Sequence, residues 1–167
     1  MAWADSRVFQ EWVKNPLFNG SGGTPPTGYT GFLTNVMKCA LFGSTASMTP
    51  DRNATLATTG YNSATSQWVV ANEKTGSSEW VAGGRALASK TNVASAGTIT
   101  LDAADLVGAA SITMSSVAGC LIYDDDITAG TIADQGMCYL FFSGDQAVTA
   151  GTFTVSFNAA GIVTATV

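Results

Sequence analysis

The chain has 167 residues, a length that fits one domain, and 12 acidic residues against 7 basic ones give it a net charge of −5. This balance leaves no basic stripe to neutralise a phosphate backbone, and no stretch is long and apolar enough to cross a bilayer, so we expect neither nucleic acid nor a membrane as a partner. Because the chain contains no histidine, Ser-His-Asp and Cys-His catalytic sets are excluded, as are the commonest zinc sites.

The first 18 residues predict a short amphipathic helix. Asp5 or Ser6 can cap its start, and Asn15-Pro16 ends it. Charged residues interrupt the apolar run that a secretory signal needs, so we expect synthesis and residence in a cytosol. The apolar residues at helical spacing form an aromatic face, which we interpret together with its flanking aromatics as a protein interface: Trp3, Val8, Phe9, Trp12, Val13 and Phe18.

A stretch without periodicity follows, "NGSGGTPPTGYTG" over residues 19–31. Its glycine, proline and threonine content is typical of an extended linker. We therefore divide the chain into an N-terminal helix and arm, residues 1–31, and a β domain, residues 32–167. A helix on such a linker can pack on its own domain or reach a neighbouring molecule.

From residue 32 onward, short runs rich in β-branched and aromatic residues alternate with turn residues. The pattern predicts a mainly β fold, an antiparallel sandwich or a barrel-like domain. Residues 66–73 and 79–87 are expected to form a hairpin, whereas 101–106 is brief enough to be a loop. The remaining strands are expected at 32–43, 97–101, 110–114, 117–125, 136–142, 151–157 and 161–167. Cys39, Cys120 and Cys138 each lie in an apolar run and are expected to be buried free thiols.

Two sequence features are candidates for a ligand-binding site. The run Asp124-Asp125-Asp126 could bind Ca²⁺, but adjacent residues on an extended chain point in opposite directions and the EF-hand spacing is missing. We favour a solvated turn, whose replacement by Asn or Ser should leave folding nearly intact. Trp68 and Trp80 could stack on sugars if exposed, although anchoring in a core or at an interface is the commoner use of an aromatic residue in β domains. No catalytic residue, metal ligand or cofactor site is expected.

The C-terminal third resembles small virion proteins of tailed bacteriophages, especially those of actinobacterial hosts. The resemblance is carried by an "IY-D" strand, an acidic loop, an apolar strand ending near "GD", then "V-A-GTFTV", "GI" and a final strand. Upstream, "VMKCALFGSTASMTPD" and "NEKTGSSEWVAGGRAL" fit the same pattern, so that it spans Val36 to Val167.

This resemblance implies a capsid decoration (head cement) protein, a non-enzymatic subunit on the outside of the phage head. The expected partners are the major capsid protein and other copies of this chain, as a homotrimer, after a stay in the host cytoplasm during assembly. The alternatives left open are a minor tail or tail-tube component and a carbohydrate-binding virion module. An enzyme ranks last, because no acid-base pair is positioned by the sequence.

Overall fold

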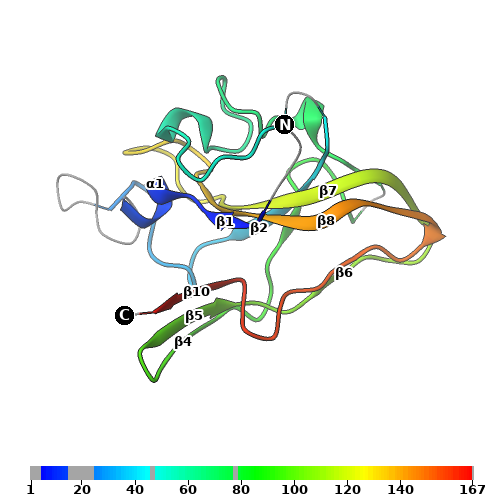
Figure 1. Ribbon diagram of the computed structural model, residues 1–167. Coiled ribbons are helices and arrows are strands. Elements are labelled where there is room, and N and C mark those ends of the chain that lie inside the picture. Colours follow the sequence, from blue (N-terminus) through cyan, green and yellow to red (C-terminus); the bar gives the residue numbers. More distant parts are fainter. Residues whose placement is uncertain (1–4, 15–24, 46–47, 77–78, 167) are drawn as a thin grey trace.

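The computed structural model describes residues 5–14, 25–45, 48–76 and 79–166. Its centre is a five-stranded antiparallel sheet in the order β1-β8-β7-β2-β3 (Figure 1). The two long strands β7 and β8 pair with each other near the middle of this sheet, and β2 pairs with the other side of β7. The bounds of these strands are β1 (Arg7–Val8), β2 (Met37–Gly43), β3 (Arg85–Ala86), β7 (Ile112–Asp124) and β8 (Gly136–Gly151).

Two smaller sheets lie below the central sheet in Figure 1. One is three-stranded, in the order β10-β5-β4, and is called the small sheet below. The other is a two-stranded pair of β6 and β9. Their bounds are β4 (Thr91–Ser95), β5 (Thr98–Asp102), β10 (Val163–Thr166), β6 (Leu106–Val107) and β9 (Thr154–Val155). The prediction of a mainly β, antiparallel fold is confirmed, and within the described residues the sheets stay open rather than closing into a barrel.

Loops from residues 48–76 cover the upper face of the central sheet, with two short 3-10 helices, η2 (Leu56–Thr58) and η3 (Val70–Asn72) (Figure 1). Trp68 from this layer is fully buried and contacts Phe42 edge-on at 5.1 Å and Tyr139 in a stacked arrangement at 6.1 Å. Because side chains alternate along a strand, the residues next to Phe42 and Tyr139 in β2 and β8 point to the opposite face of the central sheet.

The three cysteines lie on that opposite face. Cys39 is opposite Ile122, which is in turn opposite Cys138, and Cys120 is two residues from Ile122 on the same strand. All three thiols are buried and free, as the sequence predicts. Burial raises the pKa of the Cys138 thiol well above its usual range, which keeps it protonated and unreactive.

The N-terminal segment is organised differently from the predicted helix. Residues 7–8 form β1 on the edge of β8, and the helix α1 (Gln10–Trp12) spans only three residues and begins after Phe9. The two residues expected to cap a longer helix are used elsewhere. Asp5 pairs with Arg7 at 2.8 Å, and the Ser6 hydroxyl accepts a hydrogen bond from the Phe141 amide at 2.8 Å. Sheet pairing along β8 has therefore displaced the first helical turn.

The predicted hairpin over residues 66–87 is wrong. Its first half contains η3, and its second half contributes only the short strand β3, which pairs with β2. The Glu73 carboxylate explains part of the difference, because it accepts hydrogen bonds from the Tyr61 hydroxyl at 2.6 Å and from the Gly83 amide at 3.1 Å. A side-chain carboxylate, rather than strand pairing, therefore links the two halves to each other and to Tyr61. No helix of the described residues has the length and apolarity needed to cross a bilayer.

Candidate functional site

The six residues interpreted as an interface are separated by the structure. Phe9 and Trp12 are 0% and 1% exposed and belong to the hydrophobic core of this chain. Val8 and Val13 are half-buried at the edge of that core, where they remain available to line a surface. Trp3 and Phe18 lie outside the described residues. The segment of residues 5–14 thus packs on its own domain, the first of the two arrangements that the linker allows.

A groove of about 530 Å³ separates this segment from the small sheet. Its walls are apolar, and none of the described residues that line it carries a charge. Side chains from both elements meet across it: Val8, Trp12 and Val13 on one side, and Ile99, Leu101 and Val163 on the other. The groove marks where the N-terminal segment and the C-terminal strand approach each other.

The outer face of the small sheet is exposed along β4 and β10 and half-buried along β5. The register places Val93 opposite Thr100 and Thr100 opposite Thr164, so these three form one row across the sheet. Every residue of β4 is exposed, and Val93 is 54% exposed. Neither edge strand contains a charge or a proline, the usual features that block an edge. Six of its eight strand residues carry a hydroxyl group, and the full set is Thr91, Val93, Ser95, Thr98, Thr100, Asp102, Thr164 and Thr166.

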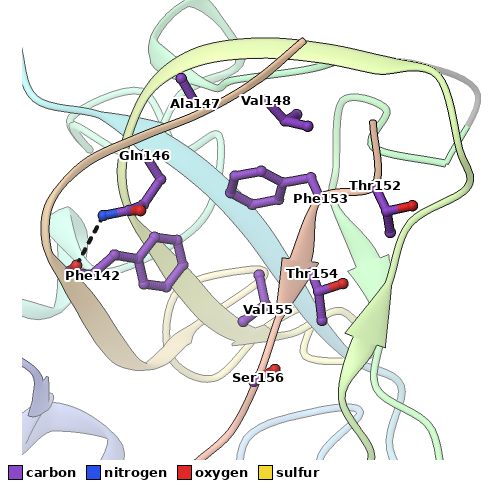
Figure 2. Close-up of a pocket in the computed structure, with 9 residues that line it drawn as sticks. All are labelled: Phe142, Gln146, Ala147, Val148, Thr152, Phe153, Thr154, Val155 and Ser156. Atoms are coloured by element: carbon purple, nitrogen blue, oxygen red, sulfur yellow. Dashed lines mark hydrogen bonds between the residues drawn. The ribbon is translucent and has the colours of Figure 1, made fainter. Parts of the chain in front are cut away.

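A second pocket, of about 430 Å³, lies between the distal part of β8 and the strand β9 (Figure 2). The sequence predicts that Phe153, Val155 and Phe157 share one face of this strand and that the hydroxyl residues share the other. Phe153 and Val155 are buried and Phe157 is half-buried against the core, whereas the hydroxyl residues are exposed, although β9 itself covers only Thr154–Val155. Gln146 closes one side of the pocket by donating a hydrogen bond from Nε2 to the Phe142 carbonyl at 3.2 Å. The lining holds no ionisable side chain, so it offers surface for contact and no acid or base.

The two tryptophans that could have formed a sugar platform are in the core. Trp68 is 0% exposed and Trp80 is 1% exposed. The Trp80 ring nitrogen donates to the Phe153 carbonyl at 3.3 Å, and the ring packs edge-on against Phe153 at 5.9 Å. Neither ring has a free face for a sugar in this fold. The hypothesis of a carbohydrate-binding module required one of these tryptophans to be exposed, and neither is.

The acidic run differs from the solvated turn that the sequence suggests. Asp124 is 0% exposed at the end of β7, and its two neighbours are half-buried. The three carboxylates turn to different partners: Asp125 pairs with Lys38 at 2.7 Å, and Asp126 accepts a hydrogen bond from the Val36 amide at 2.8 Å. The expectation that replacing all three leaves folding nearly intact is therefore corrected. Asp124 is buried, so its replacement removes hydrogen bonds that water does not restore. Among the described residues, no three His, Cys, Asp or Glu side chains are grouped to hold a metal ion.

Asp124 is held by a second buried side chain, that of Asn35. The Asn35 amide nitrogen lies 2.8 Å from each of the Asp124 carboxylate oxygens, and Asn35 is 1% exposed. The amide of Asp126 donates to the same carboxylate at 3.0 Å. The turn at Gly28 closes over this pair. A Cβ at Gly28 would lie 1.7 Å from the Asp126 carbonyl oxygen, so only glycine fits there.

Burial dominates the electrostatics of this region. Desolvation raises the pKa of the Asp124 carboxyl, opposed in part by its hydrogen bond from Asn35. Nearby, desolvation raises the pKa of Asp134 to about 6, and the neighbouring Asp125 carboxylate adds to the effect while Lys38 opposes it. Desolvation lowers the pKa of Lys90, against the attraction of Asp124 and Asp126. The loop region thus contains carboxyl groups that are protonated more readily than usual.

We expect the protein to be more stable at pH 5 than at pH 7.5. The pKa of Asp134 is about 6 in the folded chain and 3.8 in the unfolded one. The folded state therefore binds the proton more tightly, and the stability that this provides is complete below pH 3.8 and is lost as the pH rises through 6. Because Asp134 is half-exposed, solvent screening reduces the effect to about 1 kcal/mol. Urea unfolding at several pH values measures it.

Asp134→Asn is the informative variant for this pH dependence. Asparagine tolerates the positive φ of 52° at this position and cannot ionise. The variant should lose part of the rise in stability between pH 7.5 and pH 5, whereas Asp145→Asn, at an exposed position, should keep all of it. An unchanged slope in Asp134→Asn would show that Asp134 titrates normally.

Sequence reasoning missed Asn35 and Lys90. Asn35 falls in a segment expected to be strand, and Lys90 precedes β4, the strand that was not predicted. Their contacts are long-range: Asn35 is 89 residues from Asp124 and 55 residues from Lys90. One isolated sequence contains no signal that joins positions so far apart. Only the folded β2 and β7 strands bring them together.

Comparison with known proteins does not assign the chain to a group. No family model matches it, and neither does any curated protein or solved structure. Arguments about function therefore rest on the surfaces and side chains described above.

Proposed function

We propose that this protein is a non-enzymatic structural component of a phage particle, a decoration protein that binds the outer surface of the head and stabilises it. The observation that carries the proposal is the outer face of the small sheet, whose central row of Val93, Thr100 and Thr164 carries no charge and is exposed at both edge strands. Its one acidic residue, Asp102, lies at the end of β5. Charged residues are depleted from the centres of protein interfaces, so this face suits contact with another protein. The major capsid protein is the proposed partner.

Further support comes from the small sheet's edges. β4 and β10 each leave one side without a strand partner in the described structure. An open, neutral edge can pair with a strand of another subunit, so copies of this chain in a homotrimer could meet there. Many copies on one shell would also turn a weak contact into firm attachment. The resemblance of residues 36–167 to small virion proteins favours the same role.

The proposal predicts that charges on the outer face abolish attachment. In the double variant Val93→Lys/Thr164→Lys, both new charges lie in the central row of the face, at exposed positions where substitution changes stability by only about 0.5 kcal/mol. We expect its binding to heads that lack the protein to fall by about tenfold or more. Co-sedimentation with purified heads measures the loss.

A matched control separates this face from the rest of the surface. Val81 is 47% exposed, close to the value for Val93, and lies outside the small sheet. Val81→Lys should bind heads as the unmodified protein does. Equal binding by the double variant would show that the outer face does not contact the head.

Gold labelling of whole particles tests the location of the protein, and label along the tail instead of the head would favour the tail component.

A further inference from the structure

The side-chain amide of Asn35 is held at every polar atom. Its oxygen accepts two hydrogen bonds from Thr30, one from the backbone amide at 2.9 Å and one from the hydroxyl at 2.6 Å. Its nitrogen donates to the Gly28 carbonyl at 2.9 Å and lies 2.8 Å from both oxygens of Asp124. Two donors on a carbonyl oxygen stabilise the negative charge that develops there when a nucleophile attacks the carbon. A carboxyl group beside the nitrogen can deliver the proton that a departing amine needs.

A nucleophile also lies beside Asn35, at its backbone carbonyl. The Lys90 Nζ contacts the backbone carbonyl oxygen of Asn35, the same residue whose side chain is held by Thr30 and Asp124. The Phe32 ring centroid lies 5.9 Å from Nζ, so the amine is set against an apolar surface on one side. Lysine side chains normally extend into water, and this one is instead directed at a buried polar cluster.

We propose that Lys90 and Asn35 become joined by an intramolecular amide bond, with Asp124 as the proton carrier and Thr30 as the oxyanion donor. The neutral Nζ attacks the side-chain carbonyl carbon of Asn35, and a C–N bond forms while negative charge develops on the oxygen. A proton passes from Nζ through the Asp124 carboxyl to the amide nitrogen. The old C–N bond then breaks and ammonia leaves. One amine and one primary amide thus give one secondary amide and one ammonia, and no oxidant or cofactor is consumed.

The surroundings favour this reaction over hydrolysis. Asn35 and Asp124 are 1% and 0% exposed, which limits access of water to the amide carbon. Burial lowers the pKa of Lys90, which increases the fraction of neutral amine, and it raises the pKa of Asp124, which lets the carboxyl hold a proton in transit. Holding the reacting groups in one folded site replaces a bimolecular encounter with an intramolecular step.

The bond would connect the two main layers of the fold. Asn35 lies two residues before β2 in the central sheet, and Lys90 lies one residue before β4 in the small sheet. A covalent link at this point closes a loop of the chain and restricts the unfolded state, as a disulfide does. It would hold the exposed small sheet to the central sheet without cysteine chemistry. This inference stands apart from the proposed function, since it concerns the chain alone.

The intact mass of the purified, folded full-length protein tests the proposal directly. We expect most chains to be lighter than the sequence by one ammonia. Lys90→Arg should have its full mass, because a guanidinium does not act as the nucleophile. Asp124→Asn, which keeps the shape of the side chain but cannot carry the proton in the same way, should also have its full mass while remaining folded. Lys38→Arg, at the neighbouring ion pair with Asp125, should still lose ammonia. An unshifted mass in the folded unmodified protein overturns the proposal.

Tryptic digestion identifies which residues are joined. The bond blocks cleavage after Lys90, the last basic residue of the chain, so the free peptide of residues 91–167 should disappear. Residues 15–38 and 86–167 should appear as one branched product whose fragments place the link at Asn35 and Lys90. Cyclisation at Asn19-Gly20 would also release ammonia, but it would leave peptide 91–167 intact. A mass loss that maps there, or to any other pair, overturns the assignment.

Discussion

Replacing Trp12 by alanine is expected to lower the free energy of unfolding by about 3–5 kcal/mol. The side chain is 1% exposed and packs edge-on against Tyr29, with ring centroids 5.5 Å apart. Its removal leaves a cavity between the N-terminal segment and the rest of the core, which adds to the lost burial of the ring. Urea unfolding followed by fluorescence of the remaining tryptophans measures the loss.

Val13→Ala is the matched control for Trp12→Ala. Val13 is on the same short segment but only half-buried beside the groove, so its truncation should cost about 1 kcal/mol.

The same reasoning applies to deletion of residues 1–28, which would remove β1, Phe9 and Trp12 together and should prevent the β domain from reaching full stability. If Trp12→Ala were as stable as the unmodified protein, residues 5–14 would be acting as a detachable arm.

The parts of the fold that the sequence predicts are those with a strong local pattern. Apolar and β-branched runs located β2, β5, β7, β8 and β10. In β2, β7 and the first residues of β8 these runs are also the buried ones, so composition reveals both the strand and its burial. β4 was missed, since its residues Thr91–Ser95 are all exposed and show no alternation. The pattern over residues 7–13 fits a helix, yet pairing with β8 and burial of Phe9 favour an extended start. Tertiary contacts decided both cases, and a single sequence does not contain them.

The same limit applies to the polar residues. The run at Asp124 was noticed because three carboxylates are adjacent, but adjacency says nothing about burial. The sequence could not show that one carboxylate is enclosed with Asn35 while the next reaches Lys38 near the surface. Residue type alone favours a core or an interface over a sugar platform for Trp68 and Trp80, and the structure places both in the core. Polar clusters need distances, whereas apolar residues reveal much of their environment through composition.

Asp124→Ala is expected to lower the free energy of unfolding by about 3 kcal/mol. The substitution removes the acceptor for the Asn35 side-chain amide and for the Asp126 backbone amide, and Asn35, which is 1% exposed, is enclosed away from water. Measuring the effect in a Lys90→Arg background removes any contribution from the proposed amide bond. Urea unfolding of the Lys90→Arg/Asp124→Ala protein against Lys90→Arg then reports the hydrogen bonds alone.

Asp125→Ala in the same background is the control, because it changes the adjacent residue and the same charge. Asp125 and Lys38 are each roughly one-third exposed, with side-chain fractions of 31% and 28%, so the loss of their ion pair should cost less than about 1 kcal/mol. The difference between the two variants isolates burial from charge. Equal, small costs would mean that the acidic run is a solvated turn after all. A large cost at Asp124 alone would show that one carboxylate of the three holds the loop between β7 and β8 to the start of β2.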